Sequence, residues 1–142
     1  CIEDRTPRRY RITPHPDLVE SPLTGISEVV VLTDEPGELT RPFDRLFGVP
    51  RPVTLDVARL DATLHRFAGS GVALAEPRGG RLADRLDELG PAPCAVLVET
   101  TDLDASREAF SLGEAEEWHD DRIAWFDHPA LRDWLGVVEY AH

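Results

Sequence analysis

Methionine is absent from this chain of 142 residues, and cysteine occurs only twice, as Cys1 and Cys94. Two cysteines are too few for a disulfide framework and are typical of a reducing compartment, so we expect a cytoplasmic protein. Cys94 heads an apolar segment, where a small buried side chain explains it better than a nucleophile does. Because no initiator methionine is present, we expect a chain that was trimmed, processed or cut from a longer one.

Long apolar runs and basic clusters are missing as well. No stretch of about 18 apolar residues could span a membrane, and no secretory signal is visible. The chain has 15 basic and 27 acidic residues and a net charge of -12. Nucleic acids and anionic membranes are bound through clustered Lys and Arg, so we expect neither as a partner. The charge favours a cationic ligand, although a solvated acidic surface explains it more simply.

Signatures of several common active sites do not occur. The sequence holds no phosphate-binding loop, glycine-rich dinucleotide turn or nucleophile elbow, and its histidines and cysteines lack metal-binding spacing. His65, His119 and His128 are scattered and fit surface or capping positions. We therefore expect no cofactor. With 42% apolar and 30% charged residues, the composition predicts a single globular domain.

One pattern, a strand followed by a helix, occurs twice. In the second copy, residues 95–98 are β-formers, Thr101 or Asp102 offers a helix cap, and a short amphipathic helix runs from Leu103 toward a stop at Gly113. Residues 26–48 repeat this order 67 residues earlier, so that Val29 corresponds to Val96. Pro36 suits the first helical turn, whereas Pro42 should kink or delay the helix. The repetition predicts an internal duplication.

Further elements are predicted between and after these copies. An amphipathic helix spans residues 82–89 and ends at Gly90. Residues 58–68 fit either a helix or one arm of a hairpin, because they lead through Gly69-Ser70-Gly71 into the strand at 72–75. Strand composition is found at residues 52–57, 72–75, 123–126 and 136–140.

The order of these segments resembles the vicinal oxygen chelate superfamily, the group of glyoxalases, bleomycin-resistance proteins and methylmalonyl-CoA epimerases. The resemblance covers residues 25–141 and is carried by the strand at 72–77, the linker helix at 82–89 and the strand and cap at 95–105. It implies an α+β fold in which two βαβββ modules form curled half-sheets around a cleft. It also implies a homodimer.

The implied domain organisation has three parts. Residues 1–24 are an N-terminal extension, residues 25–90 the first module with its linker helix, and residues 91–142 the second module.

Enzymes of this group hold a divalent metal with His, Glu, His and Glu side chains, one from each of four strands. Carried onto this chain, the positions fall on Glu28, Ala73, Ala95 and Glu139, of which only Glu139 matches. Alanine has no lone pair, and a catalytic metal requires about three protein ligands. We therefore expect no metal here, and we expect the two alanines to leave room in the cleft.

The resemblance places Glu28 and Glu139 across the cleft from one another. Two such carboxylates could form a general acid/base pair or bind a cation. Solvation, or a bridge to an arginine such as Arg122 or Arg132, would explain them without a function.

Tryptophan is concentrated in the second half of the chain. Trp118 and Trp134, in predicted loops, are candidates for contacting a planar ligand. Trp125 and Phe126 are adjacent in a predicted strand, so they should face opposite sides of the sheet.

These observations leave three hypotheses open. The first is a metal-free protein of the drug-sequestering, antibiotic-resistance kind that binds a cationic or polycyclic compound. The second is an isomerase, lyase or cyclase with Glu28 and Glu139 as catalytic groups, or a metal-dependent glyoxalase-like enzyme with an unorthodox ligand set. The third is a degenerate module with a structural role. The candidate ligand-binding residues are Glu28, Glu139, Ala73, Ala95, Trp118 and Trp134.

Overall fold

The computed structural model describes residues 21–47, 51–67 and 69–141. It contains one mixed sheet of eight strands in the order β2-β3-β4-β1-β5-β8-β7-β6. The elements are β1 (Leu23–Leu32), α2 (Pro36–Phe47), β2 (Val53–Val57), the 3₁₀ helix η2 (Ala58–Leu60), β3 (Ala62–Arg66), β4 (Val72–Pro77), α3 (Gly80–Leu89), β5 (Ala92–Thr100), α4 (Leu103–Ala109), β6 (Glu116–Trp118), β7 (Asp121–Trp125) and β8 (Leu135–Glu139).

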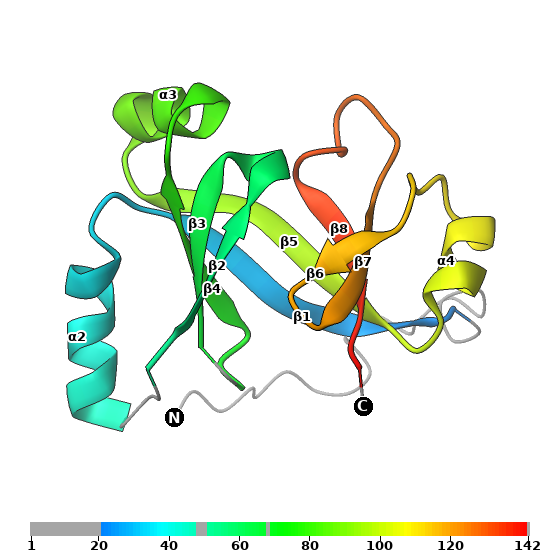
Figure 1. The fold of residues 1–142 in the computed structure, drawn as a ribbon, viewed down its shortest axis with the longest axis horizontal. Coiled ribbons are helices and arrows are strands. Elements are labelled where there is room, and N and C mark those ends of the chain that lie inside the picture. The colour runs from blue at the N-terminus through cyan, green and yellow to red at the C-terminus, as the bar shows by residue number, and fades with distance from the viewer. Residues whose placement is uncertain (1–20, 48–50, 68, 142) are drawn as a thin grey trace, which may run out of the picture.

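The sheet is symmetric about its central pair of strands. Strands β1 and β5 run antiparallel, and Val29 lies opposite Val96, the residue that corresponds to it in the sequence repeat. Each central strand has a parallel neighbour on its other side, β4 beside β1 and β8 beside β5. Figure 1 shows β1 and β5 crossing the middle of the molecule, with β2, β3 and β4 on one side and β6, β7 and β8 on the other. The predicted α+β fold with two curled half-sheets is confirmed.

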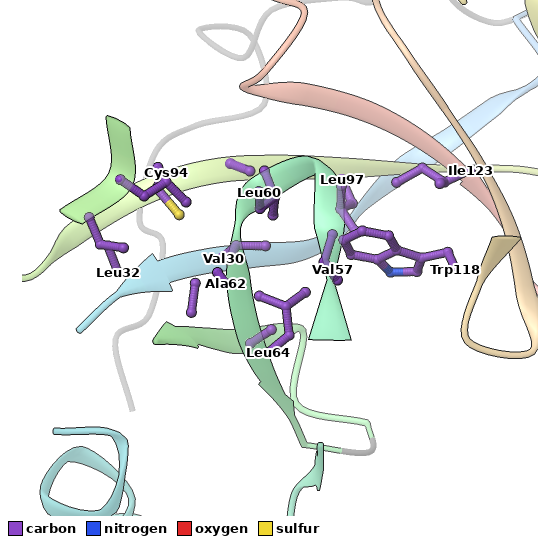
Figure 2. Close-up of a cluster of buried hydrophobic side chains, with 14 of the residues drawn as sticks. Val30, Leu32, Val57, Leu60, Ala62, Leu64, Cys94, Leu97, Trp118 and Ile123 are labelled. Carbon is purple, nitrogen blue, oxygen red and sulfur yellow. The ribbon is translucent and has the colours of Figure 1, made fainter. Parts of the chain in front are cut away.

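Two apolar clusters form on the opposite faces of this sheet. The inner cluster joins both halves and contains most of the buried side chains, including those labelled in Figure 2. The outer cluster lies under α4 and contains Leu103, Ala124 and Val137. Trp125 belongs to the inner cluster and Phe126 packs against the outer one, so the predicted alternation of this pair is correct.

The helix boundaries agree only in part with the sequence patterns. Asp102 caps α4 by accepting a hydrogen bond from the Ala105 N–H at 2.9 Å, but the helix ends at Ala109, well before the predicted stop at Gly113. Helix α3 ends as predicted, because Gly90 adopts a φ of 71° and donates to the Leu86 carbonyl at 2.8 Å. Helix α2 extends without interruption past Pro42.

The ambiguous segment after β2 contains η2 and β3, and β3 pairs antiparallel with β4, so the hairpin interpretation is correct. Strands β2 and β3 pair antiparallel, and η2 with the left-handed Asp61 makes the turn between them. The first strand begins at Leu23, within the residues predicted as the N-terminal extension, and the short strand β6 was not predicted. Most of the predicted N-terminal extension, residues 1–20, lies outside the described residues. None of the described helices is long and apolar enough to cross a membrane.

Candidate functional site

Glu28 is an acidic residue on the inner face of β1, and it is only 5% exposed. Its Oε2 accepts a hydrogen bond from Arg66 Nε at 2.9 Å, and Arg66 Nη1 lies 3.5 Å from Asp121 Oδ2. The three residues come from β1, β3 and β7. Arg66 therefore connects the two halves of the sheet through a buried ion pair.

The second carboxylate oxygen of Glu28 has no partner. Oε1 is buried and makes no hydrogen bond to any described residue. A buried acceptor left unpaired costs about 1–3 kcal/mol, and more when it is charged. A hydrogen-bond donor that reached this oxygen would therefore stabilise the buried carboxylate.

Glu28 lines a pocket of about 690 Å³ that lies between the start of β1 and the ends of β3 and β8. Its polar lining includes carboxylates from both halves of the sheet, Glu28 on β1 and Glu99 on β5. Its remaining lining residues are Ile26, Ser27, Val53, Arg66, Phe67, Gly69, Ser70, Gly71, His119 and Tyr140. The volume is sufficient for a small organic ligand.

The two polar groups beside Glu28 both keep their protons at neutral pH. Burial alone would lower the pKa of Arg66, but the hydrogen bond and the charge of Glu28 outweigh it, and the pKa is raised. The pKa of Tyr140 is raised mainly by burial. The Arg66 guanidinium lies over the Tyr140 ring, 6.0 Å from its centroid. The pocket thus presents a fixed cation and a phenol beside the carboxylate.

Glu139 does not reach this pocket. Its Oε1 accepts from the Leu103 N–H at 3.2 Å and its Oε2 from Arg122 Nη1 at 3.0 Å. Along β8 the side chains alternate, with Val138 in the inner cluster and Val137 in the outer one, so Glu139 lies on the outer face with α4. The prediction that Glu28 and Glu139 face one another is wrong, whereas the bridge from a carboxylate to Arg122 is present.

Ala73 and Ala95 lie on the inner face but do not line the pocket. They are 0% and 3% exposed and belong to the inner apolar cluster, which larger side chains such as Leu97 fill (Figure 2). The expectation that these alanines leave room in a cleft is wrong, because packing closes that space.

The residues at the four implied metal positions do not fit a divalent ion. Glu28 alone offers an oxygen on the inner face, since Glu139 lies on the other face and alanine has no donor atom. Among the described residues, no three His, Cys, Asp or Glu side chains are grouped as metal ligands.

The two tryptophan candidates lie outside the pocket. Trp118 is on β6, 2% exposed, and packs edge-to-face on Trp125 with 5.8 Å between ring centroids, so it belongs to the core (Figure 2). Trp134 is half-buried, with the guanidinium groups of Arg81 and Arg85 at 4.8 and 4.4 Å from its ring centroid. These contacts link α3 to the turn before β8, where Trp134 lies.

Several pocket residues could not be singled out from the sequence. On β3, Ala62 and Leu64 face the inner cluster, and Arg66 follows them in the same alternation. A charged residue at such an apolar position was the signal that the sequence offered. Glu99 follows Leu97 on the inner face of β5 in the same way. Nothing local marks Asp121, because its contact with Arg66 depends on the curl of the sheet.

No family model and no curated protein matches the sequence. Solved structures do share its fold. A methylmalonyl-CoA epimerase variant from Streptomyces coelicolor, in complex with 2-nitronate-propionyl-CoA, is similar over 84% of this chain and 99% of its own, with 16% identity and a TM-score of 0.65. The epimerase from Mycobacterium tuberculosis is similar over 94% of this chain and 95% of its own, with 18% identity and a TM-score of 0.63.

A hypothetical protein from Bacillus halodurans is similar over 82% of this chain and 94% of its own, with 9% identity and a TM-score of 0.62. At such identities these neighbours show the fold alone, which this chain shares with the solved methylmalonyl-CoA epimerases. The fold that the sequence resemblance implied is therefore confirmed.

Proposed function

We propose that this chain is a small-molecule-binding protein that takes a cationic or polycyclic compound into the pocket beside Glu28, without a metal. The observation that carries the proposal is Glu28, a buried carboxylate that lines a pocket of about 690 Å³ and whose Oε1 has no hydrogen-bond partner among the described residues. A protonated nitrogen on a ligand would satisfy this oxygen with a charge-assisted hydrogen bond.

The rest of the lining supports a ligand with an apolar body. Ile26 and Val53 are 71% and 48% exposed at the pocket, and Phe67 and Tyr140 add aromatic surface. Apolar walls with a few polar groups are typical of small-molecule sites. A cationic aromatic compound would bury its ring against these side chains and its nitrogen against Glu28.

The experiment measures binding of benzylamine and of the tricyclic cation proflavine by calorimetry, with benzyl alcohol as the neutral comparison. We expect both cations to bind and benzyl alcohol to bind more weakly. The Glu28→Gln variant keeps an acceptor for Arg66 but loses the charge, and it should weaken cation binding about tenfold or more. Glu88→Gln, an exposed change on α3, is the matched control. Equal affinity in the wild-type protein and in Glu28→Gln would refute the proposal.

A second candidate is an isomerase that moves a proton with Glu28. It is favoured by the fold, which this chain shares with epimerases that have been solved with acyl-CoA ligands. The unpaired Oε1 could serve as the single base of such a reaction. Incubation with methylmalonyl-CoA in deuterated water, followed by mass spectrometry, tests it. Deuterium uptake that Glu28→Gln abolishes would favour the enzyme, and no uptake would leave the binding protein.

A further inference from the structure

We infer that Asp121 is a positioning residue of this pocket, which holds the Arg66 guanidinium in an orientation that leaves Oε1 of Glu28 unpaired. This inference rests on the proposed function, because it concerns the same carboxylate. Asp121 lies at the start of β7 and is not among the residues that line the pocket. Its effect on a ligand is therefore exerted through Arg66.

The first argument is that two carboxylates on different strands share Arg66. Its Nε donates to Glu28 Oε2 at 2.9 Å, and its Nη1 lies 3.5 Å from Asp121 Oδ2. The Arg66 and Asp121 side chains are only 18% and 12% exposed, so water and salt screen their contact little. Contacts at two different nitrogens fix the rotation of the planar guanidinium as well as its position.

The second argument is a hydrogen bond that Arg66 does not make. Arginine and a carboxylate commonly pair through two parallel hydrogen bonds. Arg66 makes one to Glu28, and Oε1 has no partner among the described residues. If Asp121 did not hold it, Arg66 could turn toward both oxygens of Glu28, and a ligand cation would then compete with the guanidinium. The Glu28–Arg66 pair alone is also neutral, whereas the three groups together carry one negative charge.

The third argument is the set of other segments to which Asp121 is attached. Its Oδ1 accepts a hydrogen bond from the Ala141 N–H at 3.1 Å. Ala141 follows Tyr140, which lines the pocket and whose ring lies under the Arg66 guanidinium. His119, another lining residue, precedes Asp121 by two positions in the turn between β6 and β7. One carboxylate therefore connects three segments that carry pocket residues.

The experiment measures binding of benzylamine and benzyl alcohol by calorimetry in Asp121→Asn, which keeps an acceptor for the Ala141 N–H and loses the charge that faces Arg66. Benzylamine affinity should fall about tenfold and benzyl alcohol affinity should stay within about twofold, because only the cation uses the charge of Glu28. Asp121→Glu keeps the charge and should recover a large part of the benzylamine affinity. Glu117→Gln removes a charge from an exposed residue of the same hairpin and should leave both ligands unchanged.

A double-mutant cycle shows whether Asp121 acts through Glu28. In the Glu28→Gln background, Asp121→Asn should change benzylamine affinity by less than about twofold, because the side chain that Arg66 would cover no longer carries a charge. Thermal unfolding checks that each variant is folded. Asp121→Ser, a second neutral variant, replaces Asp121→Asn if that variant does not fold.

The outcomes separate this inference from the proposed function. If Glu28→Gln weakens benzylamine binding but Asp121→Asn does not, the positioning role is ruled out and the cation-binding pocket stands. Equal losses for benzylamine and benzyl alcohol would assign Asp121 to the stability of the fold and rule the role out as well. The same holds if Asp121→Asn weakens benzylamine equally with and without Glu28→Gln. If benzylamine binding does not depend on Glu28, both proposals fail.

Discussion

Arg66 of β3 and Glu28 of β1 form an ion pair of 2.9 Å in which the carboxylate side chain is only 6% exposed. Such a pair does not have to add stability, because both charges lose their hydration when they are buried. Removing one partner is a different matter, since the remaining charge stays buried without compensation. The pair therefore makes the pocket sensitive to single substitutions and tolerant of paired ones.

The first prediction follows from this asymmetry. Arg66→Met should lower the free energy of unfolding by about 3–5 kcal/mol, because Glu28 is left as an uncompensated buried charge. The double variant Arg66→Met/Glu28→Gln should recover a large part of that loss. Urea denaturation followed by circular dichroism measures both. If the single variant loses less than about 1 kcal/mol, Glu28 is better hydrated than the structure shows.

The second prediction concerns the buried thiol. Burial raises the pKa of Cys94 from 9.0 to about 11. The unfolded chain therefore ionises this thiol at lower pH than the native protein does, so the stability contributed by Cys94 is intact below pH 9 and is lost as the pH rises from 9 toward 11. A shift of this size corresponds to about 2–3 kcal/mol.

Urea denaturation at pH 8 and at pH 11 tests this directly. The drop in stability should be smaller in Cys94→Ala than in the wild-type protein, and the difference between the two chains isolates Cys94 from Tyr140, whose pKa is raised too. Identical pH profiles for the two chains would show that the thiol is not shielded from water.

A third prediction concerns the cap of α4. Asp102→Ala should cost about 1 kcal/mol, because the Ala105 N–H loses its acceptor at the helix start. Asp102→Asn keeps an acceptor oxygen at the same place and should cost only a few tenths of that. Thermal or urea unfolding distinguishes them. Equal losses in both variants would assign the effect to charge rather than to the hydrogen bond.

The sequence predicted the fold well because the fold depends on local patterns that occur twice. Apolar runs, the Asp102 cap and the Gly90 stop each specify an element, and their repetition gives the symmetry that places Val29 opposite Val96. The limits of α4 were missed because Phe110 leaves the helix for extended backbone. Local propensity does not determine where tertiary packing ends a helix.

The candidate site was predicted less well, because successive side chains of a strand lie on opposite faces of the sheet. Shifting a residue by one position along β8 moves its side chain to the other face, so Glu139 lies with α4 although its neighbour Val138 is in the inner core. Glu28 was placed correctly on the inner face, but its partner Arg66 comes from a segment whose structure the sequence left open. Contacts between distant strands cannot be read from either segment alone.

A fourth prediction addresses oligomeric state. The outermost strands β2 and β6 each pair with only one other strand among the described residues, and open edges of this kind favour pairing between subunits. We expect a homodimer at concentrations of tens of micromolar, measured by size-exclusion chromatography with light scattering. A monomer over that range would contradict the prediction.

The last prediction separates the two acidic residues that the sequence had paired. Glu139→Gln keeps an oxygen for the Leu103 N–H and removes the charge that faces Arg122. That ion pair is partly exposed, and such pairs contribute about 0–1 kcal/mol, so we expect a small loss of stability. Affinity for benzylamine should stay within about twofold of the wild-type value, whereas Glu28→Gln should reduce it about tenfold. A loss of binding in Glu139→Gln as large as that in Glu28→Gln would show that Glu139 belongs to the binding site. It would contradict the placement of the Glu139 side chain on the outer face of the sheet.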